Sequence, residues 1–123
     1  TQPVIARGEV SWDELNEIHR KMETLLGKEG AYLDGIYICP HHPDKGFEGE
    51  RPEYKIVCDC RKPKPGLLLR AAKDFNIDLS QSFMIGDSQR DVDAGINAKV
   101  SKSLEIGTNL PNSLLNAIRK LVG

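Results

Sequence analysis

The chain has 123 residues, of which 28% are charged and 39% hydrophobic, and its formal net charge is −1. This length suffices for one domain with one core, and the near-neutral balance excludes a general attraction to nucleic acid or to a membrane surface. No apolar run is long enough to span a membrane, and the first ten residues lack the pattern of a signal peptide. Three cysteines, an odd number, argue against a disulfide framework and favour a reducing, cytoplasmic location.

The first predicted element is a helix over residues 11–29. Ser11 and Glu14 match a capping box, in which each side chain accepts a hydrogen bond from the backbone of the other residue. Gly30 is a suitable stop for this helix. Apolar residues recur at helical spacing and predict a buried stripe, formed by Leu15, Ile18, Met22 and Leu25.

The rest of the chain alternates between predicted strands and helices around one long loop. Residues 35–39 are β-prone and end at Pro40, and residues 40–63 are rich in proline, glycine and charge, which predicts the loop. The later elements are a helix from Pro65 through Leu69, Ala72 and Phe75, a strand at Phe83–Ile85, a helix from Asp87 through Val92 and Ala94, a strand at Leu104–Ile106, and a helix from Pro111 with Leu114, Leu115, Ile118 and Leu121 inward. This order predicts an α/β fold: a single domain over residues 1–123 with a Rossmann-like parallel sheet and helices on both faces.

All three cysteines lie at the two ends of the long loop. It begins with Cys39-Pro40-His41 and ends with Cys58-Asp59-Cys60. Three thiolates and one imidazole are a known structural zinc set, and a metal would replace the core that this loop lacks. We therefore predict a zinc-binding loop whose ligands are Cys39, His41, Cys58 and Cys60. His42 is the rival to His41, and the plainer interpretation is buried thiols beside a surface histidine.

Two further polar segments follow the long loop and a predicted strand. Residues 61–66 read Arg-Lys-Pro-Lys-Pro-Gly, and residues 86–91 read Gly-Asp-Ser-Gln-Arg-Asp. A carboxylate at a strand end is a natural Mg²⁺ ligand, which indicates Asp87, and lysine or arginine among prolines can neutralise phosphate charge. Asp91 could support the metal through water or orient Lys62. The alternatives are a simple helix N-terminal charge and a solvated basic loop.

Taken in this order, Cys-x-His, Cys-x-Cys-Arg-Lys-Pro-x-Pro-Gly and Gly-Asp-x-x-x-Asp resemble the haloacid dehalogenase phosphatase superfamily. The similarity is to its D-glycero-D-manno-heptose 1,7-bisphosphate phosphatases and to the related histidinol-phosphate phosphatases. The resemblance implies a Mg²⁺-dependent hydrolase that acts on a small phosphorylated sugar through an aspartyl-phosphate. It also implies that Lys62 stabilises the transferring phosphoryl group and that Asp87 binds Mg²⁺. The substrate contacts that it implies are Arg61, Lys62, Ser88 and Gln2.

The chain departs from the family's pattern in two places. The Asp-x-Asp motif that supplies nucleophile and general acid has no match, because Asp91-Val92-Asp93 lies in a predicted helix. We therefore expect that motif to precede Thr1, so that this chain is the C-terminal part of a phosphatase domain and lacks turnover alone. The alternative function is a non-catalytic, zinc-stabilised binding module. Lys99 stands where the family often has glycine, and a positive φ there would cost about 1 kcal/mol.

Overall fold

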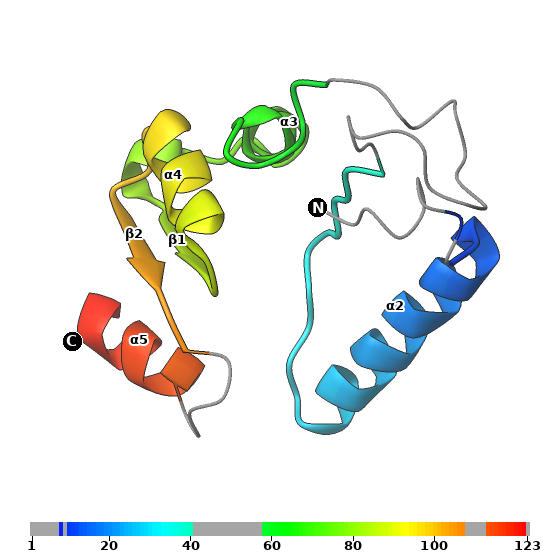
Figure 1. Ribbon diagram of the computed structural model, residues 1–123. Helices are drawn as coiled ribbons and strands as arrows, with labels where there is room; N and C mark the ends of the chain where they lie inside the picture. Colours follow the sequence, from blue (N-terminus) through cyan, green and yellow to red (C-terminus); the bar gives the residue numbers. More distant parts are fainter. Residues whose placement is uncertain (1–7, 9, 41–57, 108–112, 123) are drawn as a thin grey trace. The chain divides into compact units, whose positions relative to one another are not determined.

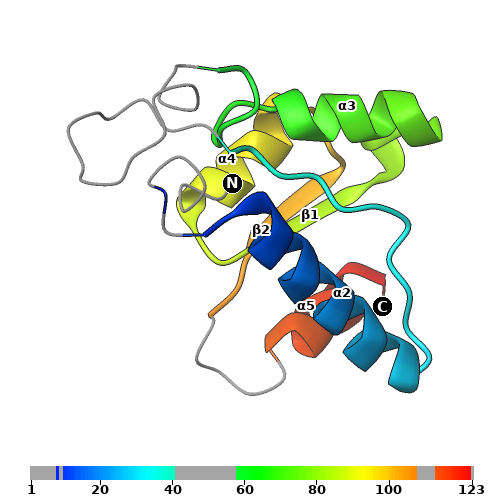
Figure 2. The ribbon, with the colours of Figure 1, turned by 90° about the vertical axis from the view of Figure 1, so that its right-hand side faces the viewer.

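The computed structural model describes residues 8, 10–40, 58–107 and 113–122. The chain divides into two compact units, Thr1–Cys58 and Asp59–Gly123, and each is described by itself. The first unit contains helix α2, Trp12–Lys28 (Figures 1 and 2). The second contains, in order, α3 (Gly66–Phe75), the 3₁₀ turn η2 (Leu79–Gln81), β1 (Phe83–Gly86), α4 (Gln89–Asn97), β2 (Lys102–Glu105) and α5 (Ser113–Val122). None of the described helices is both long enough and apolar enough to cross a membrane.

Both predicted ends of α2 are confirmed. The Ser11 hydroxyl accepts a hydrogen bond from the Glu14 N–H at 3.1 Å, and the Glu14 carboxylate accepts one from the Ser11 N–H at 3.3 Å. This capping box satisfies backbone donors that have no partner inside the helix. At the other end Gly30 has a φ of 76°, and its N–H donates to the Gly27 carbonyl at 3.0 Å. Glycine adopts this left-handed conformation without steric cost, which explains why the helix stops there.

The burial predicted for the stripe on α2 is wrong beyond its first residue. Leu15 is buried at 5% exposure, but the later members Ile18, Met22 and Leu25 are exposed. An amphipathic helix buries its stripe only where a second layer covers it. Within the described part of the first unit, Ile18 and Met22 instead line an open hollow of about 480 Å³ together with residues 36–38.

The strand predicted at residues 35–39 is not formed. A strand requires a hydrogen-bonded neighbour, and no described segment of the first unit supplies one. The inward face predicted for the last helix is wrong for three of its four residues, because α5 buries Ala117 while Leu121 is half-buried. The large apolar residues that α5 exposes are Leu114, Leu115, Ile118 and Val122.

The parallel sheet predicted for the second half of the chain is confirmed. Strands β1 and β2 pair in parallel, with Phe83 opposite Lys102 and Gly86 opposite Glu105. Parallel neighbours need a crossover, and α4 provides it. It lies against both strands, as Figure 2 shows. The α/β class therefore holds, and the carboxyl ends of β1 and β2 define one edge of the sheet.

Helix α4 approaches the strands closely because Gly95 has no side chain. A Cβ at this position would lie 2.7 Å from the Met84 Cβ and 2.4 Å from the Ser103 hydroxyl oxygen. That hydroxyl donates to the Val92 carbonyl at 2.8 Å, so it also joins β2 to the helix. Ala94, the neighbour of Gly95, carries only a methyl group and is buried at 1% exposure. These contacts hold α4 closely against β1 and β2.

The chain leaves α4 through a residue with a positive φ, at the position where the family often has glycine. Lys99 has a φ of 63°, and its N–H donates to the Ile96 carbonyl at 3.0 Å. The Val100 N–H donates to the Gly95 carbonyl at 3.1 Å, which completes a Schellman motif. A lysine in this conformation carries steric strain that glycine avoids.

Candidate phosphate and metal site

The turn between β1 and α4 brings several of the predicted site residues to the carboxyl end of the sheet. We call residues 86–91 the aspartate turn. Gly86 ends β1, Asp87 follows it, and Ser88 is the N-cap of α4. Ligands of parallel α/β sheets bind at this edge, so the turn lies where a ligand is expected.

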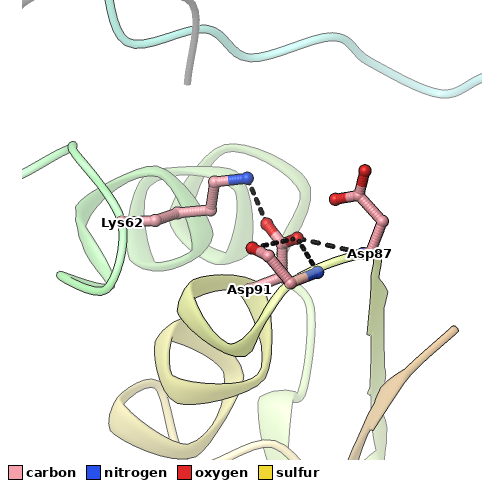
Figure 3. A network of polar contacts seen from close by, with 4 residues as sticks. Lys62, Asp87 and Asp91 are labelled. Carbon is pink, nitrogen blue, oxygen red and sulfur yellow. Dashed lines mark hydrogen bonds and ion pairs between the residues drawn. The ribbon is translucent and has the colours of Figure 1, made fainter. Parts of the chain in front are cut away.

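Asp91 is the central residue of the turn. It is buried at 3% exposure. Its Oδ2 accepts hydrogen bonds from the backbone N–H groups of Asp87 and Ser88 and from the Ser88 hydroxyl, each at 3.1 Å. Its Oδ1 accepts a hydrogen bond from the Lys62 ammonium, with which it forms an ion pair (Figure 3).

These partners keep Asp91 ionised. Burial raises the pKa of Asp91, but the hydrogen bond and charge of Lys62, with the hydrogen bonds from Ser88 and Asp87, lower it from 3.8 to about 2. At neutral pH the side chain is therefore a carboxylate. This carboxylate connects the Lys62 ammonium to the backbone N–H groups of Asp87 and Ser88.

Gly86 makes room for the Asp91 carboxylate. A Cβ at position 86 would lie 2.1 Å from the Asp91 Cβ and 2.5 Å from its Oδ2. These distances are far below van der Waals contact, so any larger residue would displace Asp91 or bend the strand end. The space left by the missing Cβ of Gly86 is therefore occupied by Asp91.

Lys62 belongs to the basic loop, residues 61–66, whose last residue begins α3. The Gly66 N–H donates to the Asp59 carbonyl at 3.0 Å, and a Cβ on Gly66 would lie 2.3 Å from that oxygen. The Asn97 side chain, at the end of α4, donates to the Pro63 carbonyl at 2.9 Å. Backbone contacts on both sides thus hold Lys62 near the aspartate turn.

Asp87 and Arg61 have groups that remain available to a ligand. The Asp87 carboxylate lies outside the polar network in Figure 3, and no hydrogen bond or ion pair with another described residue engages it. The Arg61 Nη1 atom is buried, and within the described residues it has no hydrogen-bond partner. An unpaired buried cationic nitrogen is costly, so an anion would satisfy it. An available carboxylate and an unsatisfied guanidinium fit a cation and a phosphate.

The three cysteines predicted as zinc ligands lie close together. We call Cys39, Cys58 and Cys60 the cysteine cluster. Their sulfurs lie within 4.8 Å of one another, and those of Cys39 and Cys58 are 3.4 Å apart. None of the three forms a disulfide with another described residue. Thiolates around one zinc are about 3.8 Å apart for Zn–S bonds of about 2.3 Å, whereas disulfide sulfurs are about 2 Å apart. The spacing fits a shared metal better than a disulfide.

Two predicted residues cannot be placed. His41, the fourth expected zinc ligand, lies outside the described residues, as does Gln2, the expected substrate contact. Both stay predictions. The sequence offered several roles for Asp91, of which orienting Lys62 was one. The Ser88-x-x-Asp91 spacing is that of a capping box, and this pattern could have predicted the contact between Asp91 and Ser88.

Comparison with known proteins supports the resemblance seen in the motifs. Residues 59–104 match the family described as HAD-hydrolase-like. The chain is 46% identical over 111 residues to the D-glycero-beta-D-manno-heptose-1,7-bisphosphate 7-phosphatase of Haemophilus influenzae. The matched region covers 89% of this chain and 57% of that protein. It is 39% identical over 110 residues to the enzyme of the same name from Escherichia coli K12, with coverages of 89% and 56%.

Two solved structures are also similar. One is the D,D-heptose 1,7-bisphosphate phosphatase of B. bronchiseptica complexed with magnesium and phosphate. It is 37% identical with a TM-score of 0.69, and the match covers 82% of this chain and 50% of that chain. The other, described as a HAD-like phosphatase from Mesorhizobium loti, is 30% identical with a TM-score of 0.75, covering 83% and 47%. The chain thus spans about half the length of the proteins it matches.

Proposed function

We propose that this chain, a relative of the haloacid dehalogenase-like phosphatases, supplies part of an active site that removes a phosphate from D-glycero-D-manno-heptose 1,7-bisphosphate. The observation that carries the proposal is the Lys62–Asp91 ion pair at the carboxyl end of β1, beside the available carboxylate of Asp87. It joins the basic loop to the aspartate turn. The names of the relatives support the substrate.

In this proposal each residue acts on a different part of the phosphoryl transfer. Negative charge spreads over the phosphoryl oxygens in the transition state, and the Lys62 ammonium stabilises it there. Asp87 holds Mg²⁺, which when bound would neutralise further phosphate charge. The Arg61 guanidinium pairs with an anionic group of the substrate. Ser88, whose hydroxyl is held by Asp91, lines the pocket.

We assign the nucleophile to the part of the related enzymes that this chain does not cover. The 123 residues contain no Asp-x-Asp at a strand end, and Asp91-Val92-Asp93 lies within α4. An aspartate nucleophile attacks the phosphorus atom to give an aspartyl-phosphate, which water then hydrolyses. Catalysis therefore requires the protein that contains both this chain and that motif.

The cysteine cluster, with His41 as fourth ligand, is proposed to hold a structural zinc ion. Zinc bound by four protein ligands has no open position for a substrate, so it would tie the ends of the loop together rather than take part in the reaction. Reduced thiols of this kind favour a cytoplasmic location.

The test is steady-state kinetics of the protein that contains this chain, with the heptose bisphosphate and with a simple aryl phosphate. Lys62→Ala should lower kcat about 10²-fold or more, the scale of losing one positioned electrostatic group. Asp87→Asn should require more Mg²⁺, so that added Mg²⁺ restores part of the rate. Arg61→Ala should raise KM for the bisphosphate more than for the aryl ester. Lys64→Ala, which removes an exposed lysine of the same loop, is the control. Equal rates in Lys62→Ala and the control would contradict the proposal.

A further inference from the structure

We propose that Asp91 is a positioning residue that holds the Lys62 ammonium and the Asp87 backbone in one arrangement, and that it does not itself bind the metal. The inference deepens the proposed function and rests on it. It gives the two carboxylates of the aspartate turn different roles: Asp87 binds ligands, and Asp91 orients other groups.

The donors around Asp91 engage both of its carboxylate oxygens. A carboxylate has about four acceptor sites. Oδ1 is engaged by Lys62, and Oδ2 receives three donors, two from backbone N–H groups and one from the Ser88 hydroxyl. With 3% of the residue exposed and donors on both oxygens, the Asp91 carboxylate offers little access to a metal.

A simple helix N-terminal charge does not explain these contacts. Such a residue would be solvated and would interact only with the N–H groups of its own helix. Asp91 instead accepts from the Asp87 N–H, which precedes the helix, and from Lys62, 29 residues away in sequence. At position 86 only glycine leaves room for the Asp91 carboxylate. The surrounding chain is therefore arranged around this side chain.

This arrangement prepares both charged groups before a phosphate arrives. A lysine side chain has many rotamers and three donors, so fixing its ammonium in advance removes an entropic cost from phosphate binding. The Lys62 side chain is 26% exposed, against 5% for that of Asp91, so Lys62 is the member of the pair that is more accessible to a ligand. The hydrogen bond from the Asp87 N–H fixes the backbone from which the exposed Asp87 carboxylate projects.

The experiment is a double-mutant cycle in the protein that contains this chain. Asp91→Asn keeps the shape of the side chain and removes the charge that holds Lys62. It should lower kcat about 10- to 100-fold while leaving the Mg²⁺ concentration for half-maximal rate within about twofold. Because Asp91 acts through Lys62, the double variant Lys62→Ala/Asp91→Asn should be no slower than Lys62→Ala. Asp93→Asn is the matched control, since Asp93 lies on the same helix and pairs only with Gln89 among the described contacts. It should leave the rate unchanged.

Two outcomes would overturn the inference. One is a Mg²⁺ requirement raised 10-fold or more in Asp91→Asn, which would make Asp91 a metal ligand. The other is a double variant whose rate loss equals the product of the single losses.

If the unaltered protein has no turnover, the proposed function fails instead. Calorimetric binding of inorganic phosphate with Mg²⁺, over the same variants, then decides whether the effect of Asp91 depends on Lys62. Circular dichroism shows whether Asp91→Asn folds. If it does not, Lys62→Met removes the other charge of the ion pair, at the more exposed residue, and tests the same interaction.

Discussion

Replacing Gly95 by alanine tests how closely α4 packs on the parallel strands, and Gly27 in α2 is its matched control. Both glycines are helical, so alanine gains up to about 1 kcal/mol of helix propensity at either site. At position 27 the nearest atom to a new Cβ is a Tyr32 ring carbon at 3.7 Å, an ordinary contact. Gly27→Ala should therefore stabilise its helix by about 0.5–1 kcal/mol.

At Gly95 the same change meets atoms that cannot move aside. The new Cβ would lie 2.7 Å from the Met84 Cβ, which is fixed to the backbone of β1, and 2.4 Å from the Ser103 hydroxyl. Overpacking of this kind typically costs about 1–3 kcal/mol. After the gain in propensity, Gly95→Ala should destabilise the second unit by about 0.5–2 kcal/mol.

Native-state hydrogen exchange measures both changes, because it reports the amides of α2 and α4 separately. Protection should rise in α2 for Gly27→Ala and fall in α4, β1 and β2 for Gly95→Ala. If Gly95→Ala raised protection as much as Gly27→Ala, the close approach of α4 to the strands would be refuted.

Three further predictions concern the strained lysine, the cysteine cluster and the ion pair. Lys99→Gly should raise the unfolding free energy by up to about 1 kcal/mol because the residue has a φ of 63°, and unchanged stability would argue against that conformation. Elemental analysis of protein purified without added metal should find about one zinc per chain, and chelation should make the thiols reactive; folded zinc-free protein would refute the site. Since folding lowers the pKa of Asp91 from 3.8 to about 2, the carboxylate contributes about 2 kcal/mol, present above about pH 4 and lost as the pH falls through about 2. Acid unfolding of Asp91→Asn should lack this dependence.

The features that were predicted correctly are those encoded locally. The capping box of α2, its stop at Gly30 and the strand Phe83–Gly86 each depend on a few neighbouring residues. The parallel pairing followed from the alternation of strands and helices. The positive φ at Lys99 was suggested by resemblance rather than by periodicity.

The features that were predicted wrongly depend on distant parts of the chain. Periodicity on α2 identified an apolar face, but burial of that face requires a covering layer, which periodicity does not report. The role of Asp91 depends on Lys62, 29 residues earlier, and on the missing Cβ of Gly86. Neither contact follows from a local pattern, so the sequence left Asp91 among several possible roles.

The most direct test of the central claim is ³¹P NMR of D-glycero-D-manno-heptose 1,7-bisphosphate incubated with Mg²⁺ and the protein that contains this chain. The relatives are named 7-phosphatases. We therefore predict that the C7 phosphate resonance disappears as inorganic phosphate forms, that the C1 phosphate remains, and that Lys62→Ala slows this conversion about 10²-fold or more. An intact substrate, or conversion at an unchanged rate by Lys62→Ala, would contradict the account.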